Sequence, residues 1–179
     1  LSFFGLCFAF VVIALGAWTR LVDAGLGCPD WPGCYGFVVF PTTEAEILIA
    51  EQRYPQFPYE IDKAIPEVVH RYFAAALGFI AILLVAFSYK HKLPTRIKAI
   101  ASFLLFFICC QGLFGYLTVS LKLLPIIVTG HLFGGFITLS LFFYLFLNTG
   151  DSIKNHQIGH LKILGGIALF ALLIQIFLG

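Results

Sequence analysis

The stretch YFAAALGFIAILLVAFSY, residues 72–89, contains no charged side chain. Its length approaches the roughly 20 residues that an α-helix needs to cross a hydrocarbon core about 30 Å thick. It lacks the alternation of apolar and polar residues that a membrane β-strand requires. The stretch therefore predicts a membrane-spanning helix.

Similar uncharged runs recur along the chain, at residues 1–18, 99–121, 123–150 and 163–179. The chain is 60% hydrophobic and 11% charged, with a mean hydropathy of +0.98. This composition excludes an ordinary soluble domain, which needs more polar surface. The sequence predicts an all-α integral membrane protein, a four-helix bundle plus the start of a fifth transmembrane helix.

We expect the chain to be part of a longer protein, because it contains no methionine and its last residues are still apolar. In this interpretation residues 1–150 form the bundle, and residues 151–179 form a cytoplasmic connection and the truncated start of a second bundle. No Ala-x-Ala-like cleavage site follows residues 1–18, so they are interpreted as a span rather than as a signal peptide.

The charges of the connecting segments predict the topology. Residues 20–65 hold seven acidic and three basic side chains, whereas residues 89–98 hold four basic side chains and no acidic one. Residues 148–162 hold two basic side chains and one acidic. Because cytoplasmic loops are enriched in Lys and Arg, the second and third of these segments are predicted to be cytoplasmic and loop 20–65 to lie outside.

Two local signals fall within and after the outer loop. Thr43 and Glu46 have the spacing of a capping box and predict a short surface helix. Pro66 is suited to the first turn of a helix and is predicted to begin the second span.

The first two spans resemble the next two. EVVHRYFAAALGF (67–79) opens the second span and IVTGHLFGGFITL (127–139) opens the fourth, with their histidines 61 residues apart. LGAWTRL (15–21) and LFGYLTVSL (113–121) end the first and third spans. Duplicated helix pairs are related by a pseudo-twofold axis, and sites lie at their interface.

The two histidines are the strongest candidates for a site. His70 lies four residues after Pro66 and His131 six after Pro125, which places them about 6 Å and about 9 Å into their helices. Both spans start on the outer side of the membrane, so the two histidines are predicted to lie in one layer, at a similar depth. Ionisable residues within spans indicate function, and two imidazoles from facing helices can hold one haem iron. The alternative is simple interhelical hydrogen bonding and close packing.

Charged side chains accompany this layer. Glu67 lies three residues before His70 on one helix face, where it could accept a proton from a bound ligand. Alternatively, its negative charge stabilises the start of the helix through the helix dipole and pairs with Arg71. Arg20, Arg71 and Lys122 lie near the outer ends of spans. They are candidates for binding haem propionates or for anchoring the spans at the interface.

Cys28 and Cys34 lie in the outer loop, on the side of the membrane where disulfides persist. A zinc site needs more ligands than this loop offers. A disulfide is therefore predicted. It either shapes a loop that covers the haem layer or relays electrons.

Three segments carry a family resemblance: GAWTRLVDAGLGCPDWPGCYG (16–36), PEVVHRYFAAALGF (66–79) and QGLFGYLTVSLKLLPIIVTGHLFGG (111–135). They resemble the amino-terminal half of haem A synthases of the cysteine-containing bacterial branch. The resemblance implies a membrane oxidoreductase of two four-helix bundles that oxidises the C8 methyl group of haem O to a formyl group. Its product, haem A, serves terminal oxidases. One half holds the substrate haem and the other, missing here, a haem b.

By position, the resemblance implies that His70 and His131 ligate the iron of the substrate haem. It implies that Glu67 is the glutamate essential for catalysis, and that Cys28 and Cys34 are the outer-loop pair. Since the second bundle is missing apart from residues 163–179, the chain is expected to be a truncated record or a natural half.

The resemblance also implies a multi-pass protein of a bacterial inner (plasma) membrane, with haem O and membrane lipid as partners. Haem O synthase, an electron donor and terminal oxidase assembly factors are further candidate partners. No nucleic acid is expected, and homo-oligomerisation stays open.

Two other functions fit part of the pattern. A cytochrome b-like electron carrier would bind haem between the same histidines and leave it unmodified. A quinone-linked thiol oxidase would also have four helices and an outer cysteine pair. Such oxidases normally carry a second outer pair or a C-x-x-C, and this chain has neither.

Overall fold

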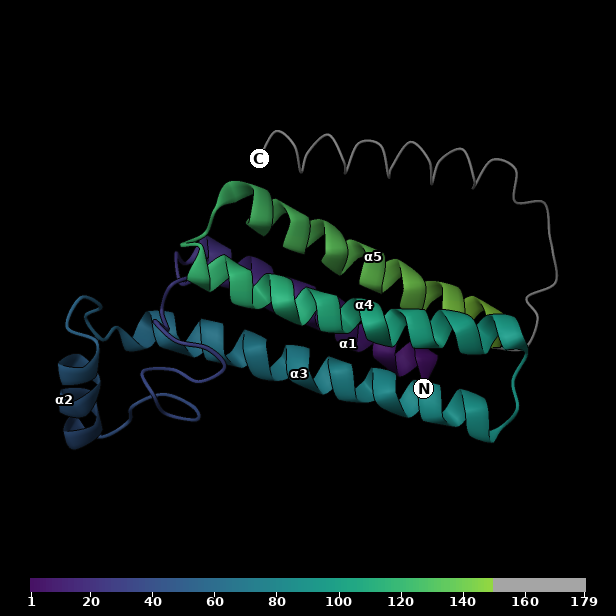
Figure 1. Ribbon diagram of the computed structural model, residues 1–179, viewed down its shortest axis with the longest axis horizontal. Coiled ribbons are helices and arrows are strands. Elements are labelled where there is room, and N and C mark those ends of the chain that lie inside the picture. The colour runs from purple at the N-terminus through teal and green to yellow at the C-terminus, as the bar shows by residue number, and fades with distance from the viewer. Residues whose placement is uncertain (150–179) are drawn as a thin grey trace. The chain divides into compact units, whose positions relative to one another are not determined.

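The computed structural model describes residues 1–149, and these form five helices and no strand (Figure 1). The helices are α1 (Ser2–Leu21), α2 (Glu44–Arg53), α3 (Ile61–Lys90), α4 (Thr95–Ser120) and α5 (Pro125–Thr149). The predicted all-α class is confirmed. The predicted fifth span and the division at residue 150 lie outside the described residues, and the domain boundaries stay a prediction.

Four of these helices, α1, α3, α4 and α5, have 20 to 30 residues and are long and apolar enough to cross a membrane. Each packs against two others, in the order α1, α3, α4, α5 and back to α1. Successive spans run in opposite directions, so α3 and α5 run parallel and face each other diagonally across the bundle. The protein is a multi-pass membrane protein built on a four-helix bundle.

The tightly packed core occupies the end of the bundle away from the outer loop. Ala9, Leu84, Leu104 and Phe142 are buried there, with Leu145 beside them. Large side chains such as Phe10 and Phe106 remain exposed on the outside, as expected of helices that face lipid.

Helix α3 begins five residues earlier than the sequence suggested, so the prediction that Pro66 opens this span is wrong. Proline cannot donate to the carbonyl one turn earlier, but that carbonyl belongs to the exposed Asp62 and is open to water. Ala64 and Val68 pack into a small second core with the outer loop, and this packing favours the additional turn. His70 consequently lies nine residues into α3, about 14 Å from its start.

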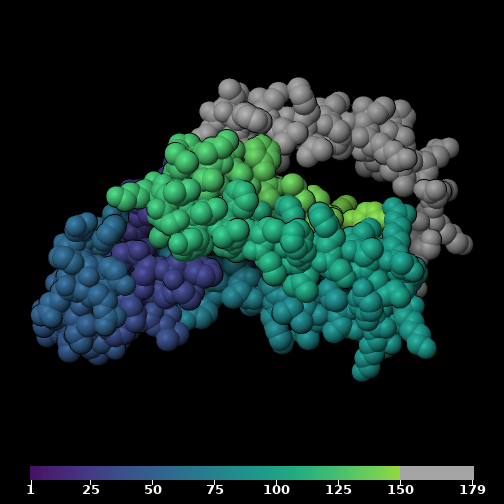
Figure 2. All heavy atoms as spheres, in the orientation of Figure 1, coloured from purple at the N-terminus to yellow at the C-terminus, as the bar shows by residue number. Residues whose placement is uncertain are grey.

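The loop between α1 and α3, residues 22–60, is called the outer loop here for its predicted side of the membrane. It gathers at one end of the bundle together with the turn between α4 and α5 (Figures 1 and 2). Trp31 of the loop contacts Tyr116 of α4, with ring centres 5.9 Å apart. The predicted capping box is present: the amide of Glu46 donates to Thr43 Oγ1, and the Glu46 carboxylate accepts from the Thr43 amide. The prediction of a short helix after Thr43 is confirmed.

Candidate functional site

The structure brings His70 of α3 and His131 of α5 together in the outer half of the bundle. Their ring centres are 6.4 Å apart and their planes are nearly perpendicular, at 82°. Because α3 and α5 lie diagonally, the imidazoles meet across the middle of the bundle. Although α3 has an additional turn before Pro66, His70 and His131 still lie at the same level, because α3 and α5 start at the same end of the bundle.

Both imidazoles are incompletely satisfied. The Nδ1 atom of each is buried and has no hydrogen-bond partner within the described part of the chain, although each ring as a whole is only half-buried. A buried polar atom without a partner costs about 1–3 kcal/mol. A ligand that paired with these two atoms would recover this free energy.

The layer around the histidines is less completely buried than the core. None of the residues 13–18, 69–76, 105–120 and 125–133 is fully buried, although all four spanning helices pass through this layer. Below it, the same helices form the close-packed core.

Glycines lie against both rings in a way that follows the internal repeat. A Cβ on Gly16 of α1 would lie 3.0 Å from Cε1 of His70, and a Cβ on Gly115 of α4 would lie 3.7 Å from Cε1 of His131. Three residues after each glycine, Thr19 and Thr118 donate to the glycine carbonyls at 2.6 and 2.7 Å. The two helix pairs thus build the two walls of the site in the same manner.

A haem fits this arrangement. Two imidazoles that bind one metal ion from opposite sides, with metal–nitrogen bonds of about 2.0–2.1 Å, have ring centres roughly 6 Å apart. The observed separation of 6.4 Å agrees. Within residues 1–149, no group of three or more His, Cys, Asp or Glu side chains could hold a bare metal ion. A porphyrin brings its own nitrogen ligands, so two histidines from the protein would be enough to hold its iron.

Glu67 lies one turn before His70 and is almost fully buried, with 5% of its surface exposed. Its Oε2 accepts a hydrogen bond of 3.0 Å from the amide of Cys28, and its Oε1 accepts from Arg71 at 2.5 Å. The carboxylate therefore joins helix α3 to the disulfide-bonded loop. The spacing from Glu67 to Arg71 predicted this ion pair, and the ion pair is confirmed.

Arg71 is engaged with the loop as well as with Glu67. Its Nη1 donates to the carbonyl oxygens of Asp30 and Gly33, at 2.9 and 2.5 Å. The sequence suggested haem propionates as its partners or an anchoring role. In the structure its guanidinium bonds the backbone of the outer loop, and a contact with a propionate would require part of this network to be released.

The predicted disulfide joins Cys28 and Cys34, and both residues are fully buried. Asp30, inside the ring that the disulfide closes, accepts hydrogen bonds from the amides of Tyr35 and Gly36. Burial, with a smaller contribution from the Glu60 carboxylate, raises the pKa of Tyr35 to about 12. Its hydroxyl therefore stays protonated and donates to the carbonyl of Pro58 at 3.0 Å.

Arg20 and Lys122 are exposed at the ends of α1 and α4, on the side of the bundle where the outer loop lies. Neither side chain makes an ion pair with another residue among residues 1–149. Both are therefore free to bind an anionic group at that end, as the sequence suggested, and this role stays a prediction.

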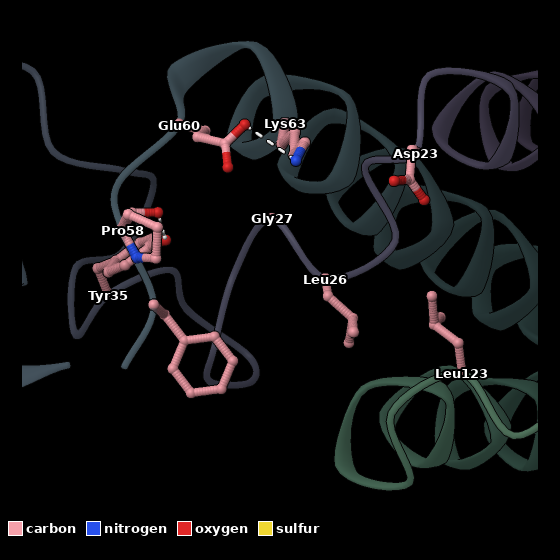
Figure 3. A pocket seen from close by; sticks show the side chains of 9 residues that line it. Asp23, Leu26, Gly27, Tyr35, Pro58, Glu60, Lys63 and Leu123 are labelled. Atoms are coloured by element: carbon pink, nitrogen blue, oxygen red, sulfur yellow. Dashed lines mark hydrogen bonds and ion pairs between the residues drawn. The ribbon is translucent and has the colours of Figure 1, made fainter. Parts of the chain in front are cut away.

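A cavity of about 260 Å³ lies within the outer loop and not between the histidines (Figure 3). The ion pair between Glu60 and Lys63, 2.9 Å long, borders it on one side, and Leu123 of the turn between α4 and α5 borders it on another. Neither His70 nor His131 is among its lining residues. We assign this cavity no ligand.

Sequence reasoning did not single out Gln111. It lies on α4 one turn before Gly115, and its Oε1 is buried without a partner among the described residues. An amide in the middle of an otherwise apolar spanning segment was the available signal.

Comparison with known proteins gives two matches. A family model described as "Cytochrome oxidase assembly protein", COX15-CtaA, matches residues 1–179. A curated protein of Shewanella oneidensis named "Heme A synthase" is 41% identical over 177 residues, which cover 97% of this chain and 53% of that protein. The chain thus spans about half the length of this relative. No solved structure gives a significant match.

The tight contact between Gly16 and His70 can be tested with Gly16→Ala. The added Cβ would press on the imidazole at 3.0 Å, so we expect haem binding, followed by Soret absorbance during titration, to weaken about tenfold, or about 1.4 kcal/mol.

Gly112→Ala and Gly115→Ala are the matched controls for this change. An added Cβ meets nothing within 4 Å at Gly112 and makes an ordinary 3.7 Å contact at Gly115. Both variants should bind haem like the unchanged protein. Equal weakening in all three would show that these helices are sensitive to any added methyl group, and would contradict a specific contact with His70.

The ion pair that joins the loop to α3 can be tested with Arg71→Gln. Breaking a buried pair costs about 3–5 kcal/mol, so the disulfide should be reduced by dithiothreitol on the order of a hundredfold faster. Reduction is measured by alkylation of Cys28 and Cys34 and mass spectrometry.

Lys63→Gln is the control, because it breaks an exposed ion pair with Glu60 that is expected to contribute little. Its disulfide should resist reduction as well as that of the unchanged protein. If the Arg71 variant is equally resistant, the loop does not depend on this ion pair.

Proposed function

This chain belongs to the COX15-CtaA family of cytochrome oxidase assembly proteins, and from that premise we propose that it forms a haem-binding half of a haem A synthase. The proposed reaction is oxidation of the C8 methyl group of haem O to a formyl group. The observation that carries the proposal is the pair of histidines whose rings face each other across the bundle at 6.4 Å. The 41% identity to a protein named "Heme A synthase" supports it.

We propose that His70 and His131 would hold the haem iron, each through one ring nitrogen. Haem O, when bound, supplies the methyl carbon that is oxidised and the iron that the histidines ligate. The flat ring would lie in the incompletely buried layer around the two imidazoles. Arg20 and Lys122, exposed at the outer ends of their helices, are proposed to attract the negatively charged propionates to that end.

Glu67 is the proposed proton acceptor. Oxidation of a methyl group removes protons together with electrons, so a base beside the reacting edge would assist the reaction. Glu67 shares the helix with His70 at a spacing of three residues, which places both side chains on neighbouring positions of one face. Its bonds to Arg71 and to the Cys28 amide hold the carboxylate in one orientation.

The disulfide is proposed to be structural. Thiol–disulfide exchange requires that a thiolate reach a sulfur atom, and both cysteines are fully buried. This burial also argues against the thiol-oxidase interpretation. The proposed location is a bacterial inner membrane with residues 20–65 outside. The proposed partners are haem O, lipid, haem O synthase, an electron donor and oxidase assembly factors.

The first test replaces the histidines. His70→Ala and His131→Ala should each abolish the haem spectrum of the membrane-extracted protein, because each removes one axial ligand. His91→Ala is the matched control, since His91 is exposed at the end of α3 and packs against Phe87, with ring centres 4.1 Å apart. Retention of an unchanged spectrum in both site variants would overturn the proposed haem site.

The second test replaces Glu67 by Gln, which keeps an acceptor for the Cys28 amide and removes the charge. Formation of haem A from haem O, followed by pigment extraction and chromatography, should fall by about a hundredfold or more, the usual contribution of a general base. Glu60→Gln is the control, because Glu60 is exposed. Unchanged haem A formation would remove Glu67 from the mechanism. Haem that is bound but never altered, even in the unchanged protein, would favour the electron-carrier function.

A further inference from the structure

Gln111 lies directly below His131 in the interior of the bundle. Gly134 follows His131 by three residues, so a side chain at position 134 would lie on the same face of α5 as the imidazole. The Gln111 amide occupies the place where a Cβ on Gly134 would be. The amide therefore lies one helical turn deeper than His131.

The amide is not explained by the packing of the protein. Its Oε1 is buried and has no hydrogen-bond partner within residues 1–149. Polar side chains in spanning helices usually bond a neighbouring helix, and this oxygen does not. An unpaired buried acceptor costs about 1–3 kcal/mol, which a ligand with a hydrogen-bond donor would recover.

The Gln111 amide distinguishes the α4 wall of the site from the otherwise similar α1 wall. Gly115 and Thr118 of α4 correspond to Gly16 and Thr19 of α1, and the same offset pairs Gln111 with Val12. Val12 is a buried apolar side chain. The two walls of the site are therefore alike around the histidines and differ one turn deeper, where only the α4 wall carries an acceptor.

We propose that Gln111 is a specificity-determining residue that accepts a hydrogen bond from a hydroxyl group on the membrane-facing edge of the bound haem. This inference rests on the proposed haem site. Charged propionates stay at the outer end, near water and the exposed cations Arg20 and Lys122, because burying charge in an apolar interior is costly. The opposite edge of the ring then faces the bundle interior, where Gln111 lies.

The chemistry of that edge separates haem O from haem b. Haem O carries there an isoprenoid chain whose first carbon bears a hydroxyl group, whereas haem b carries a vinyl group with no donor. A site with a buried acceptor discriminates against the analogue that lacks the donor, because the acceptor is then left unpaired. Gln111 thereby selects the hydroxyl-bearing haem and fixes which way round the ring enters.

The experiment titrates the haem-free, membrane-extracted protein with haem O and with haem b and measures both dissociation constants by Soret absorbance. Gln111→Met keeps the length of the side chain and removes the amide. Gly134→Ala leaves Gln111 intact and displaces its amide. Each variant should weaken haem O binding about tenfold, or about 1.4 kcal/mol, and leave haem b binding unchanged.

Ser140→Ala is the control, because Ser140 is an exposed polar residue of α5 that bonds only its own helix, at the carbonyl of Phe136. Its two dissociation constants should match those of the unchanged protein. The isoprenoid chain contributes to haem O binding in every variant, so the change in the ratio of the two constants reports the hydroxyl contact.

Equal weakening for both haems would overturn the inference and show a packing role for Gln111, while the proposed haem site would stand. An unchanged ratio in both variants would overturn it as well, as expected if the amide bonds only a buried water. If the unchanged protein binds neither haem, the proposed function fails first, and the inference fails with it.

Discussion

The buried carboxylate of Glu67 is the constraint on which the outer end of this protein depends. A charge removed from water costs several kcal/mol unless it is paired and hydrogen-bonded. Here Arg71 and the amide of Cys28 satisfy it. Because the Cys28 amide belongs to the loop, the helix can bury Glu67 only when the loop is in place. The site and its cover therefore form together.

The loop is shaped to make that contact. Gly27 lies so close to the carbonyl of Lys63 that a Cβ would overlap it, so a residue with a side chain would keep the loop away from α3. The disulfide and the Asp30 carboxylate hold the next residues in a compact turn. Arg71 then bonds the carbonyls of this turn. Glu67 and Arg71 of α3 thus bind the loop, while His70, which lies between them in sequence, meets His131 in the bundle interior.

Much of this could be predicted from the sequence, and the successes have physical reasons. Uncharged runs specify spanning helices because the bilayer leaves no other way to satisfy the backbone. The repeat and the position of His70 and His131 within it predicted their meeting, since parallel helices entering from one side place such residues at similar depth. Local rules predicted the capping box of Thr43 and the bond between Cys28 and Cys34.

The failures concern contacts between segments distant in sequence. Pro66 suggested the start of a helix. In the structure, Ala64 and Val68 are buried against residues of the loop, and this tertiary packing extends the helix to residues before Pro66. The bonds of Arg71 to the loop were not predicted, because its carbonyl partners lie 38 to 41 residues away in sequence. The position of the Gln111 amide could not be predicted, because it depends on the space left by Gly134 on another helix.

Protonation of the Glu67 carboxylate would weaken its bonds to the loop and to Arg71. If Glu67 accepts a proton during the reaction, as proposed, its attraction to Arg71 weakens because the carboxyl group becomes neutral. Arg71 then retains its bonds to the loop carbonyls of Asp30, Pro32 and Gly33, and the Cys28 amide bonds a weaker acceptor. Proton transfer at the site would thereby loosen the contact that keeps the outer loop on α3. The buried disulfide does not depend on the charge of Glu67 or Arg71. It would keep the loop folded while the contact between the loop and α3 weakens.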